Sequence, residues 1–244
     1  MQKLSVDDMK ITRLLLLLVL LLVPLAGLAE IAPTATYFDK DGNEVTEWKD
    51  IPDADAPLHV RFQANATKLE DGGTLEWHFS HQGKDGVTQL TRYEEDTEFD
   101  FVESGVTLVS LLVMYEGEEL ERKEMSITIA ESHLEMPNAF SPNDDTVNDI
   151  YGAKGMANPS ADGAYKSIIE FHAYIFNRWG QKLYEWTDIT KGWDGKYKGR
   201  PVKDGVYFVL VKARGADGIE YNIRRDVNLI RGHNTAESTT EGEQ

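Results

Sequence analysis

Residues Pro137–Asn148 read PNAFSPNDDTVN, and three further short motifs follow them along the chain. The three are Asn177-Arg178-Trp179-Gly180, Gly192-Trp193-Asp194-Gly195 and Gly205-Val206-Tyr207. Glycine accepts positive φ at little steric cost, and Asn and Asp hydrogen-bond the nearby backbone, so these motifs predict turns beside strands. We therefore expect strands joined by tight turns in this half of the chain.

Apolar segments between the motifs alternate with the period of a strand. Ile168 to Phe176 places Ile169, Phe171, Ala173 and Ile175 on one face, and Leu183 to Trp186 returns after the first Trp-Gly motif. Val206 to Val211 predicts a further strand, Ala216-Asp217-Gly218 a hairpin loop, and Tyr221 to Ile230 the returning strand. The prediction is a small antiparallel β-sandwich over residues 133–231. We expect Trp179 and Trp193 to pack over its turns, with carbohydrate stacking as the alternative.

The preceding residues, 30–132, also predict short strands and no long helix. Leu58 to Phe62 and Leu75 to Phe79 alternate apolar and polar residues, and Val106 to Tyr115 is a long apolar strand. This spacing predicts a second sandwich of two sheets, with Trp77 in its core. His78 and His81 lack further ligands at a recognisable spacing, so we expect no metal there.

Charge divides the chain at the same place. Residues 30–135 carry eight Lys and Arg against 25 Asp and Glu, whereas residues 136–231 carry 14 against 12. A length of 244 residues is enough for two domains of about a hundred residues each. The acidic anterior half argues against a nucleic-acid partner, because phosphate contacts need Lys and Arg. The chain has no cysteine, which excludes disulfides and thiolate chemistry.

The two ends of the chain predict an exported protein with a polar tail. Lys10 and Arg13 precede a Leu- and Val-rich run and a small-residue site ending at Ala29, so residues 1–29 predict a cleaved signal peptide. Met9 is an alternative start, and an uncleaved anchor is the alternative role. After cleavage we expect no stable membrane span. Residues 232–244 are polar and acidic and predict a disordered tail.

The four ordered motifs are similar to those of the gliding-motility-associated C-terminal domain, the type B sorting domain of the type IX secretion system in Bacteroidota. That resemblance implies export to the cell surface or the medium, with the outer-membrane secretion machinery as partner. Arg178 is the residue we expect to be recognised, with a structural stacked arginine as the alternative. The residues implied as the sorting and recognition motif are Pro137, Asn138, Phe140, Asn177, Arg178, Trp179, Gly180, Gly192, Trp193, Asp194, Gly195, Gly205 and Tyr207.

The anterior half resembles a PKD-type immunoglobulin-like domain. The similarity rests on Val60-x-Phe62-x-Ala64-Asn65, on Leu75-x-Trp77-x-Phe79, and on Phe101 ahead of Gly105-Val106. Where that family has Gly-Asp-Gly, this chain has Ser80-His81-Gln82-Gly83. The resemblance implies a spacer or binding module without catalytic activity.

The first motif is rich in oxygen ligands. Asn143, Asp145, Asn148 and Asp149 carry carboxylate and amide oxygens of the kind that Ca²⁺ prefers. The EF-hand spacing is not met, and the alternative is an Asx-rich turn that bonds its own backbone. We therefore expect no cofactor, with calcium as the alternative.

No enzyme motif is present: GxSxG, HExxH and a phosphate-binding glycine loop are all absent from the sequence. We expect a non-catalytic exported surface or secreted protein, whose posterior domain directs secretion and whose anterior domain binds or spaces. Two alternatives remain open. One is an adhesive or structural protein that binds glycan, calcium or another surface protein, and the other is a periplasmic or outer-membrane accessory subunit.

Overall fold

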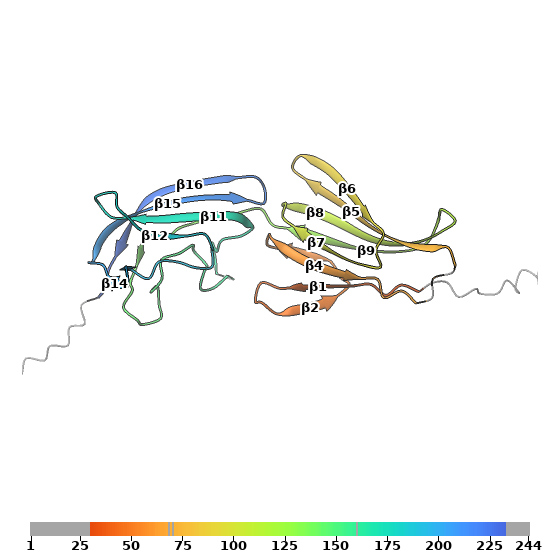
Figure 1. Ribbon diagram of the computed structural model, residues 1–244, viewed down its shortest axis with the longest axis horizontal. Helices are drawn as coiled ribbons and strands as arrows, with labels where there is room; N and C mark the ends of the chain where they lie inside the picture. The colour runs from red at the N-terminus through yellow and green to blue at the C-terminus, as the bar shows by residue number, and fades with distance from the viewer. Residues whose placement is uncertain (1–29, 68, 70, 160, 233–244) are drawn as a thin grey trace, which may run out of the picture.

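The computed structural model describes residues 30–232 except 68, 70 and 160. The predicted signal peptide and almost all of the predicted tail lie outside the described residues. Those described form strands, turns and irregular segments and no helix, which confirms the predicted all-β class. Figure 1 shows two β domains arranged end to end along the long axis. The predicted boundary at residues 132–133 falls between the last strand of one domain and the first strand of the next.

The anterior domain contains nine strands in two sheets. Strands in the order β2-β1-β4-β7 form one antiparallel sheet, and strands in the order β3-β9-β8-β5-β6 form the other. In the second sheet β3 pairs with β9 in parallel, at the edge. The strands are β1 (Thr34–Phe38), β2 (Glu44–Glu47), β3 (Ile51–Ala54), β4 (Leu58–Gln63), β5 (Gly73–Gly83), β6 (Gly86–Arg92), β7 (Asp96–Phe101), β8 (Gly105–Tyr115) and β9 (Glu118–Ile129).

Alternating side chains of β5 build the anterior core. Trp77 is fully buried, its ring centroid lies 5.6 Å from that of Phe62, and its indole N–H donates to the Glu95 carbonyl at 3.3 Å. The predicted core position of Trp77 is therefore confirmed. His78 points to the opposite face, where its Nε2 lies 2.9 Å from a Glu76 carboxylate oxygen. His81 also lies within β5, because that strand stays paired with β6 as far as Gly83.

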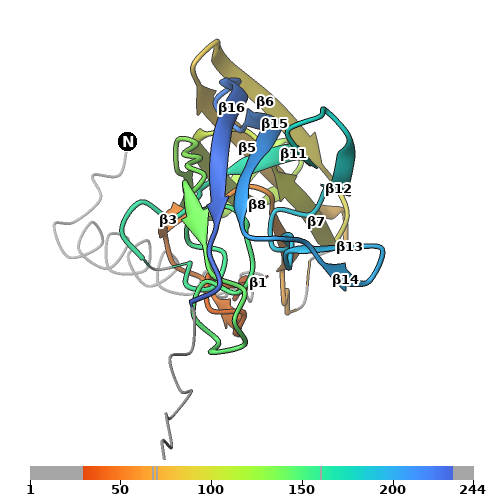
Figure 2. The same ribbon diagram turned by 90° about the vertical axis from the view of Figure 1, so that its left-hand side faces the viewer.

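The posterior domain is built on one five-stranded sheet in the order β10-β16-β15-β11-β12, and Figure 2 views this domain along the molecule from its free end. The short β10 pairs with β16 in parallel. Strands β13 and β14 form a separate hairpin. The strands are β10 (Ala139–Phe140), β11 (Ile168–Phe176), β12 (Lys182–Trp186), β13 (Lys196–Tyr197), β14 (Arg200–Pro201), β15 (Gly205–Gly215) and β16 (Glu220–Leu229).

The second layer of the posterior domain is largely irregular chain. Leu134, Met136, Tyr151 and Trp193 come from this layer and pack with buried side chains of the sheet, such as Val209. The sequence predicts a sandwich, and the structure gives one layer of sheet and one of loops with the β13–β14 hairpin. Frequent Gly, Pro, Asn and Asp in these stretches explain the difference, because they favour turns over continuous strands.

The domains meet at the turn between β15 and β16. Ala216 is buried with the anterior core, and its carbonyl accepts the Ser104 N–H at 3.1 Å. Nearby, the Ser167 hydroxyl accepts the Ala56 N–H at 3.2 Å. The hydroxyl of Ser132, in the connecting segment, donates to the Asp217 carboxylate at 2.7 Å. The two domains therefore share a packed and hydrogen-bonded junction.

Candidate functional site

Four aromatic rings, each from a different segment, meet inside the posterior domain. The Trp193 ring centroid lies 5.4 Å from that of Phe140 and 5.2 Å from that of Tyr207, and Phe140 lies 5.5 Å from Tyr151. All four side chains are buried. Three of them come from predicted motifs, so the motifs converge on one ring cluster: Phe140, Tyr151, Trp193 and Tyr207.

The backbone around this ring cluster requires the glycines of the second Trp-Gly motif. Tyr151 and Trp193 exchange two backbone hydrogen bonds of 2.8 Å each. A Cβ at Gly192 would stand 2.3 Å from the Tyr151 carbonyl oxygen, so a side chain there would force the two segments apart. Gly195 has φ of +73°, in the left-handed region that favours glycine.

Two residues that the sequence analysis missed hold this region together. The Arg231 guanidinium donates to the carbonyls of Val202 (2.6 Å) and Gly195 (3.1 Å) and to the Asp204 carboxylate at 3.0 Å. The Tyr151 hydroxyl donates to the Pro137 carbonyl at 2.9 Å, and burial raises the pKa of Tyr151. The signal that could have indicated Tyr151 is an aromatic residue soon after the first motif, whereas no local pattern marks Arg231.

The remaining motif residues shape turns and edges. The Asn138 carbonyl accepts the Asn228 N–H at 2.8 Å, which extends the pairing of β10 with β16. The Asp194 carboxylate accepts the Lys196 N–H at 3.0 Å. Gly205 has φ of +146° where β15 begins, and the Tyr207 hydroxyl donates to the Lys203 carbonyl at 2.6 Å.

The first Trp-Gly motif differs, because its side chains face solvent. Asn177 Oδ1 accepts the backbone N–H groups of Trp179 and Gln181 at 3.0 Å each, and Gly180 has φ of +78°. This turn between β11 and β12 is therefore complete without the indole ring. The predicted packing of Trp193 is confirmed, but that of Trp179 is wrong: its side chain is 82% exposed. The Arg178 guanidinium carbon lies 5.7 Å from the centroid of that ring.

The oxygen-rich loop uses its oxygens on its own backbone. The Asp149 carboxylate accepts the N–H groups of Asn143 (2.8 Å), Asp144 (2.9 Å) and Thr146 (2.7 Å). Asp145 accepts the Val147 N–H at 2.8 Å and the Asn143 amide at 2.9 Å, and Asn148 has φ of +54°. Across the described ranges, no three Asp, Glu or His side chains are grouped for a metal ion. This geometry fits the Asx-rich turn, and calcium binding stays a prediction.

Comparison with known proteins finds one family model similar to the posterior domain. Residues 134–222 match the CHU_C type IX secretion signal domain. This confirms the resemblance predicted from the four motifs. No curated protein matches the sequence. In the described part of the chain, no helix has the length and hydrophobicity needed to cross a membrane.

Three solved structures similar to this chain share little sequence with it. The FN1–FN3 domains of chicken CNTN1 are 8% identical, with 78% of this chain and 69% of that chain covered and a TM-score of 0.28. A tetra-tandem repeat from a large adhesion protein is 13% identical, with coverage of 84% and 68% and a TM-score of 0.24. Bacteroides ovatus SGBP-B, solved with a mixed-linkage heptasaccharide, is 12% identical, with coverage of 83% and 47% and a TM-score of 0.28.

An apolar depression of the posterior domain includes the end of the strand that leads into the Arg178-Trp179 turn. Phe176 on β11 is paired with Phe208 on β15, and Phe208 and Val206 are 45% and 46% exposed. Together with Arg224 on β16, these three side chains line one shallow depression. Phe176 precedes the turn that carries Arg178 and Trp179 by one residue. We group the depression with this turn, which follows it along the chain, and name the set the Trp179 face: Phe176, Arg178, Trp179, Val206, Phe208 and Arg224.

Proposed function

We propose that this protein is a non-catalytic cargo of type IX secretion. In this proposal the CHU_C domain is recognised by the outer-membrane secretion machinery, and the anterior sandwich is a binding or spacer module at the cell surface or outside the cell. The observation that carries the proposal is the CHU_C match over residues 134–222 together with the exposed Arg178-Trp179 turn inside it.

The motif residues divide into two roles in this proposal. Phe140, Trp193 and Tyr207 are buried and maintain the shape of the domain. Arg178 and Trp179 contribute little to the core and stay accessible to a partner. Protein interfaces are enriched in Trp, Phe and Arg, and a few such residues provide most of the binding energy. The Trp179 face has that composition, so it is the surface that we assign to recognition.

The anterior domain supports a binding or spacer role rather than a reaction. Its histidines engage local partners: His59 Nδ1 lies 2.7 Å from an Asp100 carboxylate oxygen, and His81 Nδ1 lies 2.9 Å from the Thr107 hydroxyl. A surface glycan or another surface protein is the class of ligand that we propose for this acidic domain.

The test is protease accessibility on intact cells. Deleting the chain from Pro137 onward would also remove Ala216 from the anterior core, so point variants give a cleaner result. Arg178→Ala/Trp179→Ala should leave the protein folded but protected inside the cell, whereas the unchanged chain is cleaved at the surface.

The control carries matched changes outside the Trp179 face. Lys191→Ala/Ile219→Ala alters two exposed residues of the same domain and should be cleaved at the surface like the unchanged chain. A folded Arg178→Ala/Trp179→Ala variant that is exported normally would overturn the assignment of recognition to this surface.

A further inference from the structure

The β13–β14 hairpin presents a basic tip in a strained conformation. Its two turn residues, Lys198 and Gly199, have φ of +50° and +76°. Positive φ at both central residues is the type I′ geometry, which favours Asn and Gly. A lysine side chain is sterically disfavoured in this region. A strained residue at an exposed tip is a reason to look for a function there.

The base of the hairpin is firmly held. The Val202 N–H donates to the Gly195 carbonyl at 3.0 Å, and the Gln181 amide donates to the Tyr197 hydroxyl at 3.2 Å. Arg231 also donates to the Val202 carbonyl. Because these bonds hold the hairpin before binding, little free energy of binding would be spent on ordering it.

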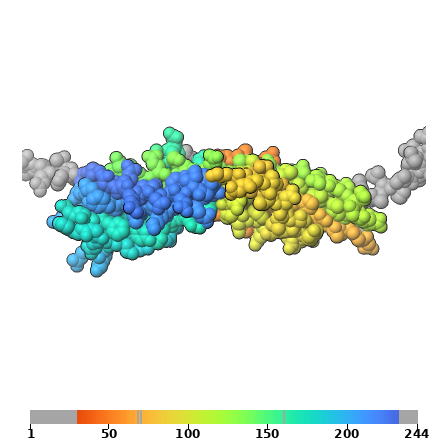
Figure 3. Space-filling view, turned by 90° about the horizontal axis from the view of Figure 1, so that it is seen from above, coloured from red at the N-terminus to blue at the C-terminus, as the bar shows by residue number. Residues whose placement is uncertain are grey.

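Two exposed cations of the hairpin and a third just after it have no acidic partner among the described residues. Lys196 is paired with Asp194 at 3.1 Å. Within residues 30–232 as described, no carboxylate oxygen lies within 4.0 Å of the charged nitrogens of Lys198, Arg200 or Lys203. Figure 3 shows this part of the chain, in light blue, projecting at the end away from the anterior domain. Its positive charge is thus available to an anionic partner.

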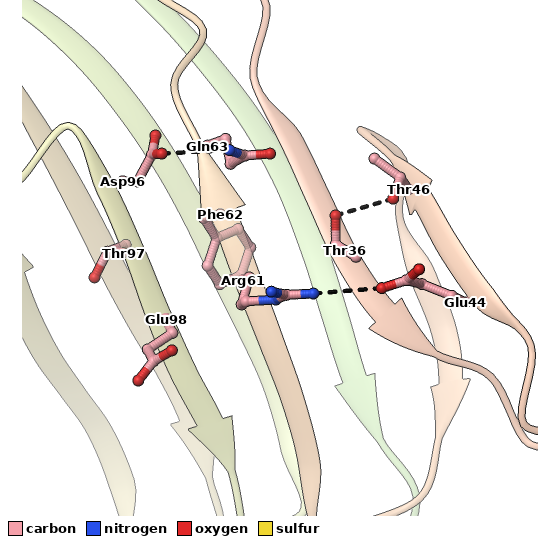
Figure 4. A pocket seen from close by; sticks show the side chains of 9 residues that line it. All are labelled: Thr36, Glu44, Thr46, Arg61, Phe62, Gln63, Asp96, Thr97 and Glu98. Atoms are coloured by element: carbon pink, nitrogen blue, oxygen red, sulfur yellow. Dashed lines mark hydrogen bonds and ion pairs between the residues drawn. The ribbon is translucent and has the colours of Figure 1, made fainter.

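The same chain carries a surface of opposite charge. A groove of about 570 Å³ follows the outer face of the β2-β1-β4-β7 sheet (Figure 4). It contains three carboxylates and one arginine, Arg61, whose guanidinium lies 3.3 Å from the Glu44 carboxylate, while Asp96 accepts the Gln63 amide at 3.3 Å. Within the part of the chain that the structure describes, the single ion-pair partner of the Glu98 carboxylate is His59, at 3.7 Å. The residues that line the groove are Thr36, Glu44, Thr46, Arg61, Phe62, Gln63, Asp96, Thr97 and Glu98.

We infer that the basic hairpin of one copy docks in the acidic groove of a second copy, so that the protein associates head to tail. Charge complementarity selects this occupant: three unpaired cations meet a groove in a domain whose residues 30–135 carry 25 acidic against eight basic side chains. Figure 1 places the hairpin at the far end of the posterior domain and the groove strands in the anterior domain. One copy therefore leaves both surfaces open, and the association can continue from copy to copy.

Sedimentation velocity on the purified protein over a concentration series tests this inference. Oligomers should form at low ionic strength and dissociate at about 1 M salt, where the Debye length is about 3 Å. Lys198→Glu/Arg200→Glu and Glu44→Lys/Glu98→Lys should each weaken self-association about tenfold or more. Lys191→Glu/Lys212→Glu and Glu118→Lys/Glu131→Lys make the same charge changes elsewhere and should associate like the unchanged protein.

Mixing the two site variants provides the sharpest result. Each keeps one intact surface, so an equimolar mixture should form a complex that neither variant forms alone. A protein that stays monomeric at every concentration and ionic strength overturns the inference and leaves the hairpin to an anionic partner outside this chain. Equal weakening by the control variants also overturns it. Export is not part of this experiment, so its outcome is independent of the proposed secretion role.

Discussion

At the scale of single residues, two tryptophans in similar motifs have opposite environments. Trp193 is fully buried and donates its indole N–H to the Lys196 carbonyl at 2.8 Å, whereas Trp179 is 82% exposed. The difference arises in the turns. Asn177 completes the first turn with its side chain, while the second motif must fit against Tyr151. One tryptophan therefore stabilises the domain and the other is free to bind.

Alanine substitutions at the two tryptophans should separate these roles. Trp193→Ala removes a buried ring and should lower the free energy of unfolding by about 3–5 kcal/mol. Trp179→Ala should change it by no more than about 0.5 kcal/mol, as for other surface substitutions. Urea unfolding followed by circular dichroism measures both. Equal effects of the two substitutions would contradict the assignment of Trp179 to recognition.

Asp149 provides a pH-dependent contribution to stability. Partial desolvation acts to raise the pKa of Asp149. The N–H donors of Asn143, Thr146 and Asp144 outweigh it and hold this pKa below its ordinary value. A carboxyl whose pKa is lower in the folded state stabilises the fold at every pH above its pKa in the unfolded chain. This stabilisation is lost as the pH falls through the pKa of the folded state. Asp149→Asn should therefore melt at lower temperature than the unchanged protein near neutral pH.

The difference in melting temperature between the Asp149→Asn variant and the unchanged protein should close in acid. Thermal scans of both proteins across the acidic range measure it, and a difference that stays constant down to the lowest pH would contradict the role of this carboxylate. Repeating the neutral scan with calcium tests the calcium prediction separately. A rise in melting temperature that Asp149→Asn abolishes would support a calcium site, through stabilisation of the folded state by the ligand.

At the scale of elements, the long hairpin was predictable and the edges were not. Predicted strands at Val206–Val211 and Tyr221–Ile230 correspond to β15 and β16, because alternating apolar residues and a Gly-containing turn are local signals. The parallel edge pairings of β3 with β9 and of β10 with β16 join segments far apart in sequence. No local pattern encodes such contacts.

The candidate site was also predictable only in part. The motifs predicted which residues cluster, since three of the four buried rings come from them. They did not predict which side chains stay exposed, because exposure depends on what other segments cover. Arg231 is the clearest omission: it lies 36 residues after Gly195, the carbonyl that it contacts.

Arg231 should stabilise the β13–β14 hairpin more than the rest of the domain. Arg231→Ala removes hydrogen bonds to Val202, Gly195 and Asp204, and bonds to charged groups contribute about 1.5–3 kcal/mol each. We expect faster amide hydrogen exchange in residues 194–204 and little change in β11. Arg231→Lys keeps the charge but loses the planar guanidinium, so its exchange rates in residues 194–204 should lie between those of the unchanged protein and those of Arg231→Ala. Uniform acceleration across the whole domain would instead indicate global destabilisation.

At the scale of the whole molecule, the charge asymmetry of the sequence suggests two independent modules, whereas the structure shows a shared junction. Ala216 is buried with the anterior core, and its N–H donates to the Ser167 carbonyl at 2.9 Å. The Asp217 carboxylate accepts hydrogen bonds from Ser132 of the connecting segment. Burial acts to raise the pKa of Asp217, but these hydrogen bonds hold it below the ordinary value. The posterior domain therefore also closes one end of the anterior core.

This junction predicts that the two domains unfold together. Ala216→Arg places a charged side chain where 8% of the alanine is exposed, and it should separate a single calorimetric transition into two. It should also expose residues 130–138 to proteases, because the segment then loses its anchor at Asp217. Ile219→Arg is the matched control, since Ile219 lies three residues away and is 47% exposed. Two transitions in the unchanged protein would show that the domains are thermodynamically independent in spite of their contacts, and two transitions in the Ile219→Arg control would show that the effect is not specific to Ala216.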